Sequence, residues 1–472
     1  MGKCHGISHG GSVGSYLCRS GKGKTTFTSG FELIFTTKPI SWDNEYFHNV
    51  FDLDWKKKKG PSNLTQWEPN MKTGSPPKAP TAFGNKTETI GLLTTDYALK
   101  VDSSYRSIVK SFKDDLNTFN NAWKHVWYKL TTADMGPRTR CINADAPPAQ
   151  PFQHPLPEPP ANPPKYGKVK KMIVKLINED PETLGKFTRL AWQCMSTFRA
   201  TDYLGGCNGA RLRFAPQKNW PGYKNLDQVL MLLRPVKEAF ESLSWSDLII
   251  LAGSTAIEKA GGRKLKFCGG RTDAMDGNGS EYLYPRIVGD IRESVKHIKY
   301  YISVMGLLKK EFAALIGVGY AIGDSNNCDG LFCLRNSFYG STPSGSLSNI
   351  MFRDLLTNTW QKHSVQRKGK KVKMYKKLYK TMCKKTMHRK QYKNLCIKLY
   401  NKIYMKLYKA EEKKLLMLST DYMFYKDKEM RAIAQDFADN NQLFLDEAAK
   451  AWTKLANADR FDGPIGNLCN KS

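Results

Sequence analysis

The spacing of apolar residues predicts a mainly α-helical chain. Between Asp102 and Leu130 apolar side chains recur every three or four positions, which is the period of an amphipathic helix. The same criterion predicts further helices at 182–198, 225–242, 246–260, 286–303, 308–322, 347–360, 427–438 and 443–457. Ser246 with Asp247 is a suitable start for the third of these, and Gly261 is a suitable stop.

Other segments lack this helical pattern. A β-prone run at 31–36 predicts a short strand, and residues from about 59 to 90 are rich in Gly and Pro, which predicts a loop. Residues 143–167, "NADAPPAQPFQHPLPEPPANPPKYG", carry the dense prolines of a linker. We therefore expect two helical domains, at 1–142 and 168–462, on either side of that linker.

The positive charge of the chain is concentrated in one segment. The net charge is +31, and residues 362–414 hold 20 Lys or Arg against two Glu, or +18 of that total. Lysines interleaved with tyrosines suit single-stranded nucleic acid, and their amphipathic pattern also suits an anionic membrane surface. The Lys, Tyr, Asn, Ile and Leu bias equally fits translated AT-rich non-coding sequence. We expect an incidental Lys/Tyr-rich insertion at about 363–416, with nucleic-acid binding as the alternative.

Cysteines and apolar runs indicate the compartment. None of the 11 cysteines forms a CxxC pair, and no Cys/His group has zinc-finger spacing. We therefore expect reduced thiols in an intracellular protein, most simply a cytoplasmic one. Apolar runs such as 248–253 are too short to cross a bilayer, and the first residues lack the apolar region of a signal peptide.

Two short motifs near the start resemble sites without meeting their requirements. The stretch from Cys18 to Thr26, "CRSGKGKTT", ends like a phosphate-binding loop, but Cys18 stands where that loop needs glycine. The following residues read as a strand rather than the required helix. His5 and His9 are four apart, but "HGISHGG" is not helical, so the two imidazoles do not share a helix face. We expect neither a nucleotide nor a metal at these motifs.

Longer stretches resemble one family. "RLAWQCMSTFRATDYLGGCNGARLRFAPQKNW" (189–220) resembles the distal helix and following loop of plant-type haem peroxidases, and "SWSDLIILAGSTAIEKAGGRKLKFCGGRTD" (244–273) resembles their next block. Upstream, "SGKGKTTFTSG", "KPISWDNEYFHNVFDLDW", "LLTTDYALKVD" and "YKLTTADMGPRTR" are similar to the later part of the first domain of catalase-peroxidases. The order of the blocks also matches. The chain, apart from about 363–416, resembles the C-terminal two-thirds of a catalase-peroxidase.

This resemblance implies a fold and a chemistry. The fold is mainly α, with two haem-peroxidase-like domains, the first of them incomplete. Hydrogen peroxide and small electron donors are the implied substrates, haem b in the first domain is the cofactor, and a homodimer is the assembly. Distal Arg, Trp and His act above the iron, and a proximal His, held by an Asp, ligates it from below. "MGKCHG" matches the residues just after the proximal ligand, so we expect that His upstream of Met1.

Some positions of the first domain match the family and others depart from it. Asp96 matches the Asp that would hold the proximal ligand, and Ser29 matches the serine at the haem edge. Phe35 stands at the proximal Trp position, and Ala133 replaces a mobile Arg that supports catalase activity. With the distal residues and the ligand also missing, we expect a partial gene product that does not bind haem or turn over peroxide by itself.

The second domain carries a comparable set of residues. Arg189 and Trp192 match the distal Arg and Trp, but Gln193 replaces the distal His, and an amide cannot shuttle protons near neutral pH. Tyr320 stands at the proximal position and Asp421 at the position of the Asp. A tyrosinate can ligate haem iron, but we expect a Tyr packed among helices without haem. The domain would then be a structural support for a separate peroxidase half.

Overall fold

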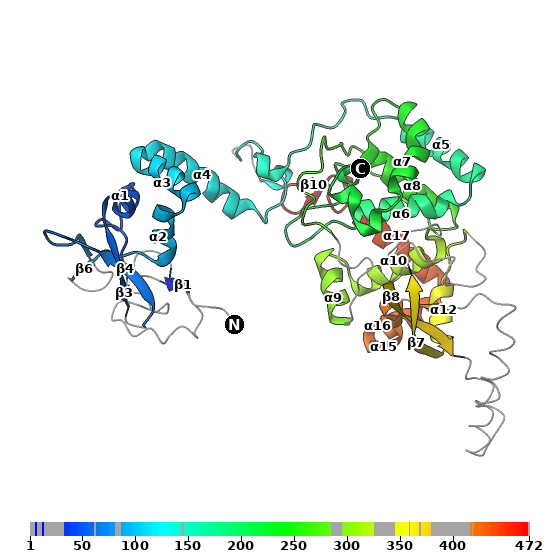
Figure 1. Cartoon of the computed structure of the whole chain (residues 1–472). Helices are drawn as coiled ribbons and strands as arrows, with labels where there is room; N and C mark the ends of the chain where they lie inside the picture. The colour runs from blue at the N-terminus through cyan, green and yellow to red at the C-terminus, as the bar shows by residue number, and fades with distance from the viewer. Residues whose placement is uncertain are drawn as a thin grey trace, which may run out of the picture. The chain divides into compact units, whose positions relative to one another are not determined.

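The computed structural model describes twelve stretches of the chain, namely residues 5–6, 12–13, 33–60, 63–80, 86–142, 146–284, 295–324, 345–357, 359–367, 370–378, 416–417 and 419–470. The chain divides into two compact units, Met1–Thr131 and Thr132–Ser472, which are described separately below (Figure 1). The predicted domain boundaries at 142 and 168 stay predictions.

The first unit combines helices with short antiparallel hairpins. Its helices are α1 (Glu45–Asp52), α2 (Thr94–Val101), α3 (Ser103–Asp114) and α4 (Leu116–Thr132). Its strands pair as β1 (His5–Gly6) with β2 (Ser12–Val13), β3 (Trp55–Lys59) with β4 (Thr65–Pro69), and β5 (Lys78–Pro80) with β6 (Thr87–Thr89). The helix predicted over 102–130 is present as α3 and α4.

Two predictions for this unit are wrong. Residues 59–90 are not one loop, because β4, β5 and β6 lie within them. The strand predicted at 31–36 is not formed at 33–36, the described part of that range.

The β3–β4 hairpin is held by Trp55 and Trp67, whose side chains are buried, whereas the four residues after Trp55 are exposed lysines. A run of lysines conceals the apolar–polar alternation that identifies strands.

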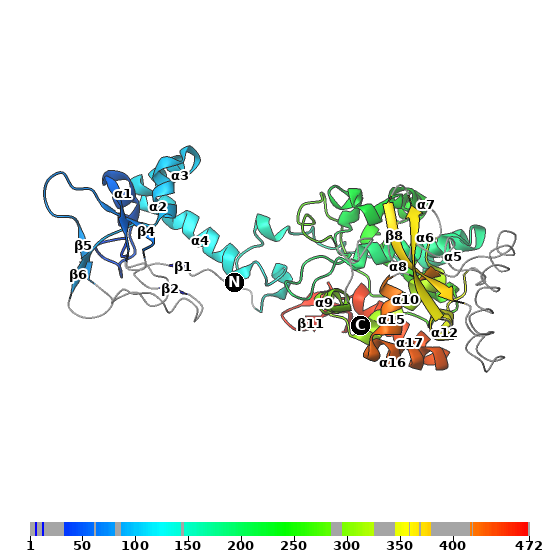
Figure 2. The same cartoon turned by 60° about the horizontal axis from the view of Figure 1, so that its bottom comes forward.

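The second unit is a larger helical assembly (Figure 2). Its helices are α5 (Tyr166–Glu179), α6 (Thr183–Met195), α7 (Leu226–Glu238), α8 (Trp245–Lys259), α9 (Val295–Val304), α10 (Lys309–Ile322), α12 (Ile350–Thr357), α15 (Ser419–Lys426), α16 (Lys428–Asp439) and α17 (Asn441–Ala456). The mainly helical fold is as predicted. The helix predicted at 347–360 has the clearest error in its bounds, because α12 ends at Thr357 and a strand begins at Thr359.

The central packing of this unit brings α6 against α8 and α10 against α17. Gly253 of α8 makes the first contact possible, because a Cβ at that position would lie 2.4 Å from the Ala191 Cβ of α6. Gly317 of α10 has the same role beside Phe444 of α17, with 2.6 Å from its would-be Cβ to that ring. Helix α8 is capped by the Ser244 hydroxyl, which accepts from the Asp247 amide at 3.0 Å. These close contacts fix the position of α6, which carries three of the predicted site residues.

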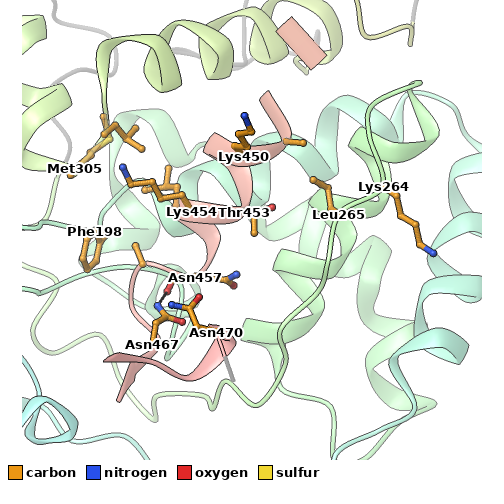
Figure 3. A pocket seen from close by; sticks show the side chains of 15 residues that line it. Phe198, Lys264, Leu265, Met305, Lys450, Thr453, Lys454, Asn457, Asn467 and Asn470 are labelled. Atoms are coloured by element: carbon orange, nitrogen blue, oxygen red, sulfur yellow. Dashed lines mark hydrogen bonds between the residues drawn. The ribbon is translucent and has the colours of Figure 1, made fainter. Parts of the chain in front are cut away.

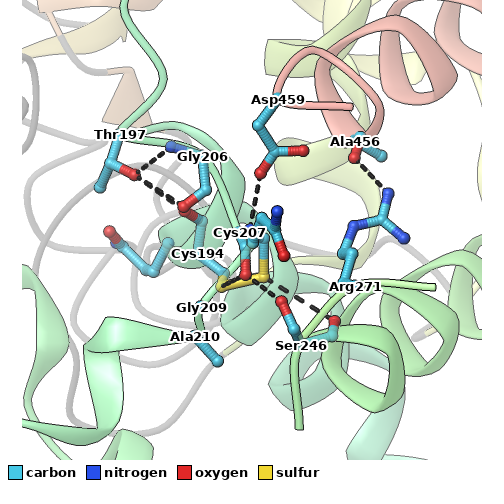
Figure 4. The surroundings of a disulfide bond; sticks show 12 residues. Cys194, Thr197, Gly206, Cys207, Gly209, Ala210, Ser246, Arg271, Ala456 and Asp459 are labelled. Atoms are coloured by element: carbon cyan, nitrogen blue, oxygen red, sulfur yellow. Dashed lines mark hydrogen bonds between the residues drawn. A yellow bond between two sulfur atoms is a disulfide. The ribbon is translucent and has the colours of Figure 1, made fainter. Parts of the chain in front are cut away.

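Two disulfides contradict the prediction of reduced thiols. Cys194 is bonded to Cys207 and Cys268 to Cys469. The first disulfide is buried, and the Ser246 hydroxyl donates to the Cys207 carbonyl beside it (Figure 4). The second joins positions 201 residues apart, and spacing in a sequence cannot reveal such a contact. The intracellular location stays a prediction, without the support of reduced thiols.

The described part of the predicted insertion is β-structure. Strand β7 (Thr359–Arg367) pairs antiparallel with β8 (Lys370–Leu378), which also pairs with β9 (Leu416–Met417). Residues 379–415, most of the predicted Lys/Tyr-rich insertion, lie outside the described residues. Two further strands, β10 (Phe461–Asp462) and β11 (Gly466–Asn467), form a hairpin near the end of the chain. Among the described helices, none has the length and apolar character needed to span a bilayer.

Candidate functional site

Helix α6 brings three of the predicted residues together on buried positions. Arg189, Trp192 and Gln193 each have at most 1% of their surface exposed. The Arg189 guanidinium donates from Nη1 to Asp324 Oδ2 at 2.9 Å and from Nη2 to the carbonyl oxygens of Gly222 and Lys224. Asp324 follows the end of α10 and is also buried. The guanidinium is thus engaged by an ion pair inside the protein.

Beside this ion pair, the first turn of α6 touches the backbone of the two residues that follow α10. A Cβ on Gly185, in the first turn of α6, would lie 2.7 Å from the Gly323 carbonyl oxygen and 2.9 Å from the Asp324 Cα. Only glycine tolerates such an approach. In a haem peroxidase the macrocycle would separate the distal from the proximal helix. The described residues leave no room for a haem between the first turn of α6 and the end of α10.

Gln193 occupies the position of the distal base and offers no acid–base group. Its side-chain Oε1 and Nε2 are buried and have no hydrogen-bond partner among the described residues. The main-chain carbonyl oxygen of Gln193 accepts a hydrogen bond from the Tyr223 hydroxyl at 2.5 Å. Burial raises the pKa of Tyr223 above its ordinary value, so this phenol stays neutral. Neither group can take a proton from a substrate near neutral pH.

The two remaining predicted residues of this unit lie on other helices. Tyr320 belongs to α10, and its hydroxyl donates to Asp354 Oδ2 of α12 at 3.4 Å. Asp421 belongs to α15, and its side chain lies outside the described residues. No group of three His, Cys, Asp or Glu side chains able to hold a metal occurs in the part of the chain that the structure describes.

In the first unit, Asp96 and Phe35 lie close to the same tyrosine. Asp96, in the first turn of α2, accepts from the Leu93 amide at 2.7 Å and from the Tyr46 hydroxyl at 2.8 Å. The Phe35 ring stands edge-on to the Tyr46 ring, with 6.0 Å between centroids. Burial raises the pKa of Asp96, and the two donors oppose that rise. Ser29, the third residue predicted for this unit, lies outside the described residues.

Burial also changes the pKa of Tyr46. Desolvation and the nearby charge of Asp96 both raise the pKa of the Tyr46 phenol, so it remains a hydrogen-bond donor. In the family that the chain resembles, the indole N–H of a Trp donates to this Asp, and Phe35 at the Trp position has no such donor. Tyr46 supplies a donor from α1 instead. The sequence patterns give no indication of this role, because Tyr46 and Asp96 are 50 positions apart.

A surface cavity of about 630 Å³ lies elsewhere in the second unit, between α17 and the C-terminal residues (Figure 3). Its polar lining consists of lysines, a threonine and asparagines, with Lys450, Lys454, Asn457, Asn467 and Asn470 among them. Lys450 pairs with Glu447 and Lys454 with Glu311, at 3.1 and 2.7 Å. The two ammonium groups are therefore neutralised, and the lining contains no acid or base suited to catalysis.

The mainly helical fold, with Arg189 and Trp192 buried on α6, is the arrangement that the resemblance to peroxidases implies. A model of the peroxidase family matches residues 169–440. The chain belongs to the peroxidase family, and within that family it is related to the catalase-peroxidases.

Several catalase-peroxidases are similar to the chain over nearly its whole length. "Catalase-peroxidase 2" of Legionella pneumophila is 31% identical over 99% of this chain and 64% of its own length. A catalase-peroxidase of Phenylobacterium zucineum is 29% identical over 98% of this chain and 63% of its own. That of Leptospira biflexa is 31% identical over 94% and 58%. The chain therefore spans less than two thirds of the length of these relatives.

Proposed function

We propose that the chain contributes to hydrogen peroxide removal as a catalase-peroxidase whose second unit is a haem-free support. The buried ion pair between Arg189 and Asp324 is the observation that carries this proposal. A distal Arg acts in peroxidases by stabilising charge that develops on the substrate. Here a buried carboxylate of the same unit already neutralises the guanidinium.

The residue at the base position supports the same conclusion. Peroxide cleavage needs a group that takes a proton from one oxygen and returns it to the other. Gln193 provides a neutral amide, and its neighbour Tyr223 a neutral phenol. We infer that this unit does not cleave peroxide and that it stabilises the protein of which it is part.

The remaining features of the proposal come from the family. Haem b would be the cofactor of the complete protein, hydrogen peroxide and small electron donors its substrates, and a homodimer its assembly. The chain alone would be inactive, because its described residues provide no distal base. An intracellular, cytoplasmic location belongs to the same proposal. Nucleic-acid binding through 362–414 stays a prediction, to which the described residues add no support.

Peroxide consumption tests the proposal. The full chain is incubated with haem b, and loss of hydrogen peroxide is followed against haem b alone. We expect the two rates to agree. Turnover well above the rate of free haem, abolished by Arg189→Leu, would assign an active centre to the second unit and overturn the proposal. Gln193→Leu is the matched control, because it removes an amide to which we assign no catalytic role.

A further inference from the structure

The two disulfides of the second unit differ in their access to solvent. Cys194 and Cys207 are each 1% exposed, so a reagent reaches their sulfur atoms only when the surrounding structure opens. Cys268 and Cys469 are both partly exposed. Thiol–disulfide exchange begins when a thiolate attacks one of the two sulfur atoms, so its rate depends on access to them. The bond between Cys268 and Cys469 is therefore the one that is open to thiols.

The Cys268 side of this bond belongs to a firmly held loop. Arg271 donates from Nη1 to the Cys268 carbonyl oxygen at 2.5 Å. Arg460 donates to the carbonyl oxygens of Gly269 and Gly270, at 2.9 and 3.0 Å. Both arginines are buried. None of these hydrogen bonds involves a sulfur atom, so the loop keeps its anchors when the S–S bond breaks.

The other side of this bond lies in a segment that few contacts hold. Residues 468–470 form a short 3₁₀ helix without a buried side chain. The Leu468 amide donates to the Arg460 carbonyl oxygen at 2.9 Å, and the Asn467 side chain donates to the Asn457 carbonyl oxygen at 2.7 Å. A segment with exposed side chains and few hydrogen bonds opens at a low cost in free energy. The disulfide is therefore the strongest attachment of this segment to the rest of the unit.

The same segment forms part of the wall of the surface cavity beside α17 (Figure 3). Asn467 and Asn470 line this cavity, and Cys469 lies between them in the sequence. Phe198 and Met305 belong to the apolar part of the lining. Displacement of the two asparagines would remove polar side chains from the wall and give solvent more access to the apolar lining. The state of the disulfide is thus coupled to the shape of the cavity.

We propose that the pair Cys268 and Cys469 is a redox modification site, which fastens this wall of the cavity when oxidised and releases it when reduced. The reductant is a small dithiol. One of its thiolates attacks a sulfur of the pair, the S–S bond breaks, and a mixed disulfide forms. The second thiol of the reagent then displaces the bound protein sulfur. The reagent leaves as a cyclic disulfide, and the protein gains two electrons and two protons as two thiols.

Hydrogen peroxide is the oxidant that restores the bond. The thiolate of one cysteine attacks the peroxide, the O–O bond breaks, and a sulfenic acid and one water form. The thiol of the other cysteine then displaces a second water from the sulfenic acid, and the S–S bond forms again. This inference goes beyond the proposed function and does not depend on it, because neither step uses haem.

Thiol labelling of the folded full chain tests the chemistry. The chain is treated with dithiothreitol and alkylated, and the free thiols are located by peptide mass spectrometry. We expect Cys268 and Cys469 to be alkylated faster than Cys194 and Cys207 by about tenfold or more, because reaction of the buried pair requires local opening. Hydrogen peroxide, added after the dithiothreitol is removed, should restore the bond. Equal alkylation rates for the two pairs, or no return of the bond, would overturn the proposal.

Hydrogen exchange tests the release of the wall. Reduction should make the amides of 466–470 exchange faster by about tenfold or more, since a disulfide contributes more than that to stability, and should leave 268–271 unchanged. Cys469→Ser should exchange fast with and without dithiothreitol. Cys141→Ser is the matched control and should behave like the unsubstituted chain, because Cys141 is an exposed free thiol. Exchange at 466–470 that does not change on reduction would overturn the proposal. Haem titration tests the proposed function separately, so the two can fail independently.

Discussion

Arg189 and Asp324 form a buried ion pair, with 2.9 Å from Nη1 to Oδ2, between α6 and the second residue after α10. Arg189 belongs to the segment that resembles a peroxidase distal helix, yet its charge is compensated from within its own unit. The same contact holds α6 against the segment that follows α10. One interaction thus accounts for two of the observations on which the proposed haem-free role of this unit rests.

Removing one partner of this pair should destabilise the chain strongly. Arg189→Ala leaves the Asp324 carboxylate buried without its counter-charge, which costs about 3–5 kcal/mol. Urea unfolding of the full chain measures the loss. Arg263→Ala is the matched control, because Arg263 pairs with Asp446 where both side chains are about half exposed, and we expect less than about 1 kcal/mol. Equal losses for the two variants would show that the buried pair has no special importance.

The Tyr46–Asp96 hydrogen bond predicts a pH-dependent effect of Tyr46→Phe. The hydroxyl stabilises the charged form of Asp96, and losing it should cost about 1 kcal/mol at pH 7.5. Burial raises the pKa of Asp96 above its ordinary value of 3.8. The stability contribution of a carboxyl with a raised pKa is present at acid pH and is lost as the pH rises through that pKa. In the variant the pKa is higher still, so this loss is larger.

The cost of Tyr46→Phe should therefore be small near pH 4 and grow toward pH 7.5, as measured by urea unfolding at both pH values. Tyr105→Phe is the control, because Tyr105 is an exposed tyrosine of α3, and its cost should be near zero at each pH. A cost for Tyr46→Phe that does not change with pH would contradict the assigned hydrogen bond.

The disulfide between Cys268 and Cys469 should stabilise the end of the chain. It closes a segment of 201 positions, and removing such a link costs about 2–5 kcal/mol. We expect Cys469→Ser to lower the melting temperature measured by calorimetry under non-reducing conditions. Cys141→Ser should leave it unchanged, because Cys141 is an exposed free thiol. If reductant has no effect on the unsubstituted chain, the thiols are reduced as the sequence pattern predicts.

The charge of residues 362–414 predicts a non-specific attraction to nucleic acid. Nucleic-acid binding is the alternative to an incidental insertion, and under that alternative this segment, with a net charge of +18, gives the chain an affinity for a single-stranded oligonucleotide that falls steeply with salt. Fluorescence anisotropy at two salt concentrations measures it. Deletion of 362–414 should abolish the affinity, and unchanged binding would exclude the segment as its source.

The helical fold could be predicted largely from the sequence. Apolar residues identified α6, α8, α10 and α17: α17 buries one stripe of its surface, and the other three are buried on nearly all sides. Gly261, with φ of +94°, ends α8 as expected. The β3–β4 hairpin could not be predicted, because Trp55 is followed by four lysines. Short strands of this kind depend on contacts with residues elsewhere in the chain.

The candidate site could be predicted only in part. Sequence placed Arg189, Trp192 and Gln193 together, since they lie within two turns of one helix. It could not identify Asp324, which is 135 positions from Arg189. A buried Arg predicts that some carboxylate lies nearby, but its position follows only from the contact of α6 with α10. The same holds for Tyr46, whose role depends on how α1 packs beside α2.

The most direct test of the account is a haem titration of the full chain followed in the Soret region. The account predicts that added haem b keeps the spectrum of unligated haem, because the first turn of α6 touches the residues after α10 and Tyr320 donates to Asp354. Tyr320→Phe should then give the same spectrum as the unsubstituted chain. A saturable Soret shift at one haem per chain, lost in Tyr320→Phe, would contradict the haem-free assignment of the second unit.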